Sequence, residues 1–267
     1  MNTLLIDIGN SRIKWALLRG AKLGRQQVLP LNGSGGAQFR QLIAAALGAA
    51  PRRPATAIVA VNVAGAARAN ALAAAARRAG LPPPLLVTSR RSAVGLRNGY
   101  RDAWRLGADR WVAAVAAWHL AGRKRPVCVI SAGTALTVDV VDAAGRHRGG
   151  LIIPGPQLMV RALLRNTHGI AARARTRRAT RPVRFATTTR QAIESGAAQA
   201  CAALIEHAVR NARDEFGART QVFLTGGAAP ALRSLLSLPH VHAPALVLQG
   251  LAVLLAAAGL HRETVAA

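Results

Sequence analysis

Near its start the chain places an acid, a glycine and small polar residues in the middle of an apolar run, TLLIDIGNSRIKWALL. Such a turn points successive backbone N–H groups into one concavity, which suits an anion such as phosphate. Asp7 falls where a buried strand ends, and a carboxylate there needs a partner, which a metal–phosphate complex would provide. The simpler interpretation is a β-hairpin turn, because Gly9 and Asn10 are ordinary turn residues. From these residues alone, both interpretations stay open.

A second stretch, VCVISAGTALTVDVVD, repeats this arrangement later in the chain. When Gly133 is aligned with Gly9, Ser131 falls at the position of Asp7, and each copy has an apolar strand, a small-residue turn and an alternating strand. A third turn, TGGAAP at residues 225–230, follows another apolar strand. Two equivalent turns at the starts of two lobes favour phosphate binding more strongly than one glycine turn would.

Hydrophobic periodicity, together with the Gly, Pro and capping residues that end helices and strands, predicts the elements that must position these turns. We expect strands at 3–6, 13–17, 56–63, 85–88 and 222–224, and helices at 38–47, 68–79, 111–121 and 189–216. Residues 95–110 have no clean period and should be rich in loops. The segment RKRP at 123–126 is the best candidate for a boundary, which predicts one lobe at 1–122 and a second at 123–267.

The chain has 267 residues, of which 51% are hydrophobic, and its formal charge is +26. So large a positive charge suggests nucleic acid or an anionic membrane as a partner. The arginines are nevertheless spread over the whole length, and the few aromatic residues are not interleaved with them as a stacking platform for single strands requires. We therefore favour solvated Arg-rich faces over a nucleic-acid site.

Cysteine usage and apolar runs indicate the compartment. Cys128 and Cys201 belong to no CxxC pair, so we expect buried, reduced thiols. Asp7 breaks the one early apolar run, which argues against a signal peptide. The late apolar run at 246–260 is shorter than the roughly 20 residues that a bilayer requires. We expect a cytoplasmic protein without a membrane partner.

Several motifs together point to a known family. They are DIGNSRIK (7–14), GLRNGY (95–100), GADRW (107–111), AGTALTVD (132–139), GGLIIPG (149–155), TRQAIESG (189–196) and TGG (225–227). With these motifs in this order, nearly the whole chain resembles the type III pantothenate kinases, which include the Bvg accessory factor homologues. The resemblance implies the α/β fold of the acetate kinase, sugar kinase, heat-shock chaperone and actin superfamily, with two ribonuclease H-like lobes and an active-site cleft between them.

The resemblance also implies an ATP site that uses Mg²⁺. Its residues would be Asp7, Ile8, Gly9, Asn10, Ser11, Arg12, Ile13 and Lys14 at the first turn, and Thr134 on the opposite lobe. Asp7 would coordinate or orient the Mg²⁺ through water. Lys14 would add positive charge, although as a strand residue it could equally be solvated. Phosphoryl transfer asks the protein mainly for alignment and charge neutralisation, and two facing turns supply both.

On the substrate side, the general base of the family maps onto Asp109. A carboxylate there would take the proton of the pantothenate hydroxyl, although acids are also common in first helical turns because they complement the helix dipole. Arg110 would bind the carboxylate of pantothenate and Tyr100 its polar groups. Thr189 carries over as a further contact, from the other subunit of a homodimer, and a helix-capping role is compatible with this. The implied substrate site is Tyr100, Gly107, Ala108, Asp109, Arg110 and Thr189.

The chain departs from the family at Ser131, where many members carry an acid linked to a bound monovalent cation. Serine and backbone carbonyls could still ligate K⁺ or NH₄⁺, so the implied cofactors are ATP with Mg²⁺ and one of these cations. Asp139 and Asp142 are acids near strand ends. Asp139 could face the metal, but we interpret both as solvated loop acids.

Three hypotheses for function follow. The leading one is ATP-dependent phosphorylation of pantothenate to 4′-phosphopantothenate, the first step of coenzyme A biosynthesis. The alternative from another class is a basic regulatory protein that binds nucleic acid, which the charge supports. The third is a sister enzyme acting on a sugar or a polyphosphate. GADR and GLRNGY argue against the third, because they form the substrate-side signature and not the shared nucleotide side.

Overall fold

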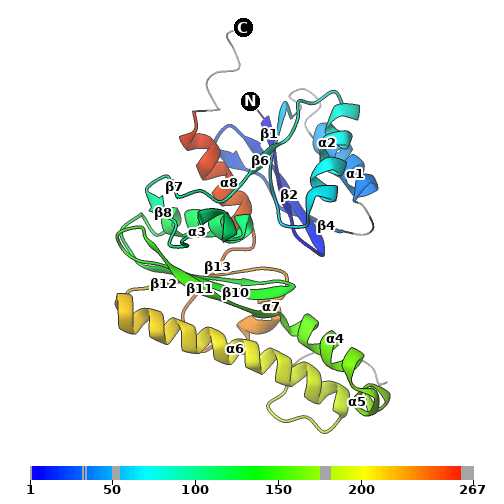
Figure 1. Cartoon of the computed structure of the whole chain (residues 1–267), viewed down its shortest axis with the longest axis vertical. Coiled ribbons are helices and arrows are strands. Elements are labelled where there is room, and N and C mark those ends of the chain that lie inside the picture. Colours follow the sequence, from blue (N-terminus) through cyan, green and yellow to red (C-terminus); the bar gives the residue numbers. More distant parts are fainter. Residues whose placement is uncertain (1, 32, 34, 50–54, 175–181, 260–267) are drawn as a thin grey trace. The chain divides into compact units, whose positions relative to one another are not determined.

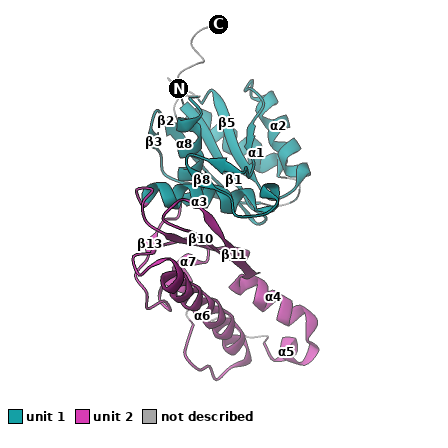
Figure 2. Cartoon of the chain, turned by 60° about the vertical axis from the view of Figure 1, so that its left-hand side comes forward, with its two compact units in different colours: residues 1–120, 245–267 teal, residues 121–244 magenta. Residues whose placement is uncertain are grey.

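The computed structural model describes the chain except residues 1, 32, 34, 50–54, 175–181 and 260–267 (Figure 1). Two compact units are formed, one by residues 1–120 with 245–267 and the other by residues 121–244 (Figure 2). The sequence predicts a boundary close to the first of these breaks but places residues 245–267 with the second lobe. They join the first unit because helix α8 (Leu246–Ala257) packs against helix α3 (Ala108–Leu120) and strand β1 (Asn2–Ile8).

The first unit is built on a mixed sheet with the strand order β3-β2-β1-β5-β6, in which β4 also pairs with β2. The remaining strands are β2 (Arg12–Arg19), β3 (Lys22–Leu23), β4 (Gln27–Pro30), β5 (Ala57–Asn62) and β6 (Leu85–Val87). Strand β1 runs antiparallel to β2 and parallel to β5. Helices α1 (Gly36–Gly48) and α2 (Ala66–Arg78) bury their apolar residues against one face, in a cluster that includes Leu4, Ile6, Phe39 and Leu72.

The predicted loop-rich stretch of this unit contains only short elements before α3 begins. Strands β7 (Ser92–Ala93) and β8 (Leu96–Arg97) form a hairpin, followed by the 3₁₀ turn η1 (Ala103–Arg105). The two residues of the hairpin turn, Val94 and Gly95, both have positive φ, at 46° and 86°. That is the pattern of a type I′ turn, which matches the twist of the strands on either side.

The second unit repeats the start of the first. Its sheet has the order β11-β10-β9-β12-β13, with β9 antiparallel to β10 and parallel to β12. The strands are β9 (Val127–Ala132), β10 (Ala135–Val141), β11 (His147–Pro154), β12 (Gln221–Thr225) and β13 (Val241–His242). The helices are α4 (Pro156–Asn166), α5 (His168–Arg173), α6 (Thr189–Phe216) and α7 (Ala229–Arg233). Helix α6 spans the predicted residues and packs against one sheet face through Cys201, Ile205 and Val209.

Both cysteines are free and buried in this second core, as expected. Burial, with a smaller contribution from the charge of Asp139, raises the pKa of the Cys128 thiol to about 12, and burial raises the pKa of Cys201 to about 11. Both thiols are therefore protonated at neutral pH, and neither is a nucleophile there.

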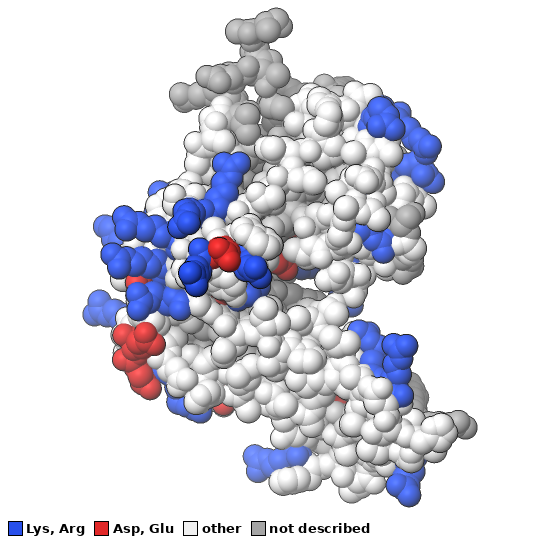
Figure 3. All heavy atoms as spheres, viewed as in Figure 1, with Lys and Arg blue, Asp and Glu red and all other residues white. Residues whose placement is uncertain are grey.

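The surface carries positive side chains on both units (Figure 3). In the described part of the chain, no helix combines the length and the apolar character needed to cross a membrane.

Candidate active site

The first predicted phosphate turn, Gly9-Asn10-Ser11, joins β1 to β2 in the first unit. The N–H of Gly9 donates to the carbonyl of Arg12 at 3.1 Å, which closes the turn. Asn10, Ser11 and Arg12 are exposed, whereas Ile8 and Ile13, which pair across the base of the turn, are fully buried. Of the predicted ATP residues, the two isoleucines can therefore offer only their backbone, while the exposed tip can offer backbone and side-chain donors.

The buried carboxylate beside this turn has a partner within its own hairpin. Asp7 is 6% exposed and stands directly opposite Lys14, whose Nζ lies 3.3 Å from Asp7 Oδ2. An acid removed from water needs such a counter-charge. The ion pair explains the burial of Asp7 without a metal, and it places the Lys14 ammonium beside the acid. Both the hairpin interpretation and the phosphate interpretation are compatible with this geometry.

The second and third turns lie side by side in the second unit, because β9 and β12 are parallel neighbours that end together. Ser131 of β9 pairs with Thr225 of β12. Gly226 has a φ of +100°, and a Cβ there would lie 2.2 Å from the carbonyl oxygen of Ala132. The glycine therefore lets the two turns approach each other through their backbones. The backbone carbonyl of Thr134, the predicted phosphate contact, accepts the N–H of Gly155 at 2.8 Å.

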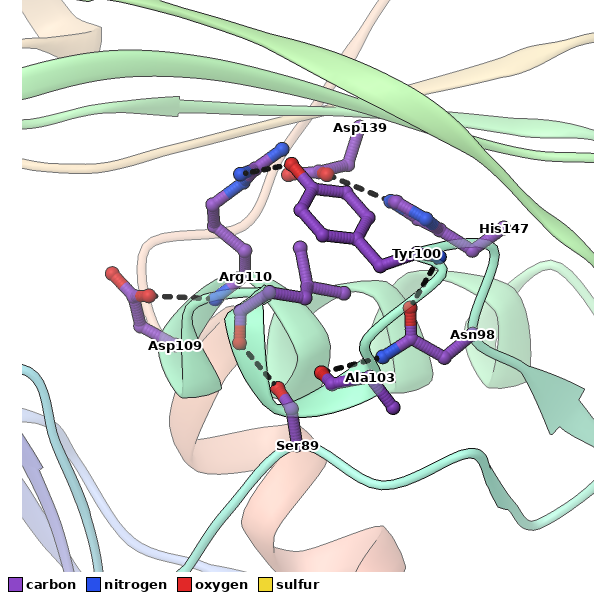
Figure 4. A network of polar contacts seen from close by, with 9 residues as sticks. Ser89, Asn98, Tyr100, Ala103, Asp109, Arg110, Asp139 and His147 are labelled. Atoms are coloured by element: carbon purple, nitrogen blue, oxygen red, sulfur yellow. Dashed lines mark hydrogen bonds and ion pairs between the residues drawn. The ribbon is translucent and has the colours of Figure 1, made fainter.

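The predicted substrate motif converges at the start of α3 in the first unit (Figure 4). Arg110 is only 6% exposed, and its Nη1 donates to the phenol oxygen of Tyr100 at 3.0 Å. Its guanidinium carbon also lies 5.7 Å from the centre of the Tyr100 ring. The chain therefore holds a buried cation against an aromatic side chain ten residues earlier.

Asp109 lies in the first turn of α3, where the partial positive charge of a helix N-terminus complements a carboxylate. Its Oδ1 accepts the N–H of Arg110 at 2.8 Å. A Cβ on Gly107 would lie 2.8 Å from the same oxygen, so glycine leaves the room that this carboxylate uses. Gly107 and Ala108 thus shape the turn, and Asp109 and Arg110 supply its charged groups.

Thr189 is the predicted substrate residue of the second unit, and it is the first residue of α6. The helix is capped by its neighbour, because the Thr188 hydroxyl accepts the N–H of Gln191 at 3.4 Å. The residue that caps α6 is therefore Thr188 and not Thr189. The predicted contact of Thr189 with substrate stays a prediction.

The expectation that Asp139 is a solvated loop acid is wrong. Asp139 is 1% exposed, and its Oδ1 lies 2.8 Å from Nε2 of His147, which is 2% exposed (Figure 4). The pairing was missed because His147 belongs to the next strand, where a register irregularity between Val140 and Val141 brings it into reach. Asp142 does lie in a loop, where it accepts the N–H groups of Ala144 and Arg146. Among the described residues, no three His, Cys, Asp or Glu side chains gather as a metal site would require.

Two residues that the sequence did not assign hold the loop before α3. The Asn98 side chain forms hydrogen bonds with backbone groups of Arg90, Tyr100 and Ala103. The Ser89 hydroxyl donates to the carbonyl of Leu106 at 2.7 Å. The only sequence signal for Asn98 was its place inside GLRNGY, and Ser89 lies outside every motif.

Solved structures of other proteins share this fold. A Baf family protein from Campylobacter jejuni is 18% identical, with a TM-score of 0.55 over 96% of this chain and 99% of that one. MreB5 of Spiroplasma citri, bound to ADP, is 10% identical, with a TM-score of 0.50 over 94% of this chain and 95% of that one. These likenesses confirm the α/β fold predicted from the actin-like superfamily.

Sequence comparison identifies the family. A model described as type III pantothenate kinase matches residues 3–211. The type III pantothenate kinase of Aromatoleum aromaticum is 42% identical over 253 residues, which are 94% of this chain and 96% of the relative. That of Nitrosococcus oceani is 35% identical over 252 residues, 93% of this chain and 92% of the relative. With the family model over most of its length and these relatives over almost all of it, the chain belongs to the type III pantothenate kinases, which phosphorylate pantothenate in coenzyme A biosynthesis.

Proposed function

We propose that this pantothenate kinase uses Asp109 as the general base that takes the proton of the pantothenate hydroxyl while the γ-phosphoryl group of ATP is transferred, giving 4′-phosphopantothenate. A hydroxyl is a poor nucleophile until a positioned carboxylate accepts its proton. The observation that carries the proposal is the placement of Asp109 at the start of α3, next to the buried Arg110–Tyr100 pair. Two consecutive residues thus place a base and an anion-binding cation side by side.

Arg110 is the group that we assign to the pantothenate carboxylate. A guanidinium that is 6% exposed has little water to solvate it, and a planar carboxylate matches its fork of donors. The Tyr100 phenol oxygen accepts a hydrogen bond from one of those donors and so fixes the plane of the guanidinium. Thr189 is proposed as a further substrate contact from the partner subunit of a homodimer.

The turns of the two units are assigned to ATP, with Gly9 to Ser11 and Lys14 in the first unit and Thr134 in the second. The first turn fits Mg²⁺ that arrives with the nucleotide, because Mg²⁺ typically binds through one or two carboxylates, several waters and the substrate phosphates. Asp7 is the carboxylate in place, and it would hold the ion through water. The ion would neutralise phosphate charge, and the Lys14 ammonium 3.3 Å from Asp7 would add to that.

The decisive experiment measures ADP release by the purified chain with Mg·ATP and either pantothenate or a panel of sugars and small hydroxy acids. We expect release with pantothenate alone, in proportion to the phosphopantothenate formed. Stimulation by a sugar and not by pantothenate would reject the proposal. Binding of DNA with a steep dependence on salt would instead support a nucleic-acid partner.

For the monovalent cation we propose a site of neutral oxygens around Ser131. Thr137 and Thr225 are its partners on the two neighbouring strands, so the three hydroxyls form a row on one face of the second sheet. Thr137 is 9% and Thr225 is 1% exposed. Neutral oxygens can replace the hydration shell of K⁺, so the residues present fit K⁺ or NH₄⁺ without the acid that many relatives carry.

Replacing Ser131 by aspartate should lower the K⁺ concentration for half-maximal activation by about five-fold, which is what a modest ion pair is worth. The same added charge lies beside a phosphate turn, so without K⁺ it should also raise the KM for ATP. The measurement is ATP saturation across a K⁺ titration, with Na⁺ holding the ionic strength constant. Identical K⁺ curves for the two proteins would show that position 131 does not contact the cation.

The homodimer and a cytoplasmic location remain proposals. The dimer is supported by apolar side chains on the edge strand β11, where Leu151 and Ile152 are 45% and 59% exposed, and by Phe185, which is 88% exposed. Exposed apolar side chains that gather into a patch are typical of an interface. A monomeric mass in light scattering at micromolar concentration would contradict the dimer.

A further inference from the structure

We infer that Asn98 is a positioning residue for pantothenate binding, which acts by fixing Tyr100 and, through it, the guanidinium of Arg110. The inference rests on the proposed function, because it takes Tyr100 and Arg110 as the groups that contact the substrate. Asn98 itself is given no contact with substrate. Its role would be to fix the positions of the Tyr100 phenol and the Arg110 guanidinium before pantothenate binds.

The Asn98 side chain uses its whole amide to tie Arg90, Tyr100 and Ala103 together, and Figure 4 shows its bonds to Tyr100 and Ala103. Its Oδ1 accepts the N–H of Tyr100 at 2.9 Å, which makes an Asx turn. Its Nδ2 donates to the carbonyl of Ala103 at 3.1 Å and to the carbonyl of Arg90 at 3.3 Å. An amide has one acceptor oxygen and two N–H donors, and all are engaged here. Asparagine is the residue type that fits this place.

The backbone of Asn98 is fixed as well, because its N–H donates to the carbonyl of Arg91 at 2.8 Å. It follows directly on the β7–β8 hairpin, whose type I′ turn sets the direction in which the chain leaves. Ser89 provides a second tie farther along, by donating to the carbonyl of Leu106 just before Gly107. The loop that carries Tyr100 is therefore held at both ends, and Asn98 holds the end nearer to Tyr100.

From Tyr100 the connection passes to the proposed substrate cation. The backbone of Tyr100 is fixed by Asn98, and its phenol oxygen accepts from Arg110 Nη1 at 3.0 Å. A displaced Tyr100 would deprive the guanidinium of this partner and allow it to shift. Small errors in the placement of binding groups cost activity far beyond the lost bond, since a shift of about 1 Å can cost a hundred-fold.

A merely structural role would make a different prediction. If Asn98 only stabilised the loop, its loss would lower the melting temperature and affect both substrates alike. If it positions Tyr100 and Arg110, Asn98→Ala should raise the KM for pantothenate roughly ten-fold while the KM for ATP stays within two-fold, because the expected displacement is well under 1 Å. Steady-state kinetics in both substrates separates these outcomes.

Asp142→Ala is the matched control, because Asp142 also uses a side-chain oxygen to accept N–H groups two and four residues on, in a loop between β10 and β11. It should leave the KM for pantothenate unchanged. An equal rise of both KM values in Asn98→Ala, or the same rise in Asp142→Ala, would overturn the inference.

Asn98→Asp adds a test that depends on pH. The aspartate can still accept the N–H of Tyr100, but as a carboxylate it faces the carbonyl oxygens of Arg90 and Ala103. Those oxygens favour the protonated acid, which can donate to one of them. Relative to wild type at the same pH, the KM for pantothenate should fall toward the wild-type value between pH 7.5 and pH 5.5. Asn98→Ala should show no such recovery. If the KM for pantothenate of Asn98→Asp relative to wild type does not change with pH, the positioning role is contradicted.

A double-mutant cycle with Tyr100→Ala identifies which proposal fails. If Asn98 acts through Tyr100, adding Asn98→Ala to Tyr100→Ala should raise the KM for pantothenate by less than two-fold, against roughly ten-fold in the wild-type background. Full additivity would overturn the inference and leave the proposed substrate site intact. A Tyr100→Ala variant with an unchanged KM for pantothenate would overturn the substrate role of Tyr100 and the inference together.

Discussion

Asp109→Asn should lower kcat by roughly 10² to 10⁴-fold, the range that loss of a general base typically costs. Asparagine cannot take the hydroxyl proton, so the substrate oxygen would have to attack phosphorus without that assistance. The fold should be preserved, because the amide oxygen of asparagine can still accept the N–H of Arg110 that Asp109 Oδ1 accepts at 2.8 Å. The interaction of the charge with the helix N-terminus is lost, which is worth about 0.3–1 kcal/mol.

The measurement compares kcat, both KM values and the melting temperature of Asp109→Asn with those of Asp102→Asn. Asp102 is an acid seven residues earlier, in the loop before α3, where its exposed side chain forms an ion pair with Arg105 at 3.1 Å. Its substitution should leave kcat close to wild type. The KM for ATP should be little changed in either variant. If Asp109→Asn keeps more than about half of the wild-type kcat, Asp109 is not the base.

Gly250→Ala should destabilise the protein by about 3 kcal/mol, at the upper end of what overpacking costs. A Cβ at this position would lie 2.1 Å from the carbonyl oxygen of Val112 and 2.7 Å from its Cγ1. The first neighbour is backbone of α3 and cannot rotate away, so α8 and α3 would have to separate. Since α3 carries Asp109 and Arg110 at its start, a shift of this helix should also reduce pantothenate turnover.

Gly196→Ala is the control for this substitution. Gly196 also lies within a helix, α6, but a Cβ there would meet nothing within 4 Å. Alanine in an open helical position is favoured over glycine by roughly 0.5–1 kcal/mol, so this variant should be at least as stable as wild type. Thermal unfolding should give a melting temperature about 6–12 °C below wild type for Gly250→Ala. Equal melting temperatures for the two variants would contradict the close packing of α3 on α8.

Local signals predicted most of the elements that position the site. The alternation of Ile13, Trp15 and Leu17 predicted β2, and the spacing of Thr188 and Gln191 predicted the cap of α6. These features depend on neighbours within a few residues, so a short stretch of sequence is enough to predict them. The role of Asp109 came from family motifs, because a first-turn acid alone is explained equally well by the helix dipole.

The features that escaped prediction depend on partners far away in the sequence. Nothing near Gly250 indicates that its helix packs on Val112, and the apolar run around it could be read only as too short to span a membrane. The pairing of Asp139 with His147 depends on the register of two strands. The hydrogen bonds of the Asn98 side chain depend on a loop conformation that the motif GLRNGY does not indicate.

The return of α8 to the first unit has a consequence for synthesis on the ribosome. Residues 121–244 are continuous in the chain, whereas the first unit needs both residues 1–120 and α8. Leu246, Leu248 and Leu251 of α8 are fully buried, so the first unit lacks part of its core until all of the second has been made. Domains usually fold in the order in which they emerge. Here the later unit can be complete while the earlier one still lacks the helix that covers part of its apolar core.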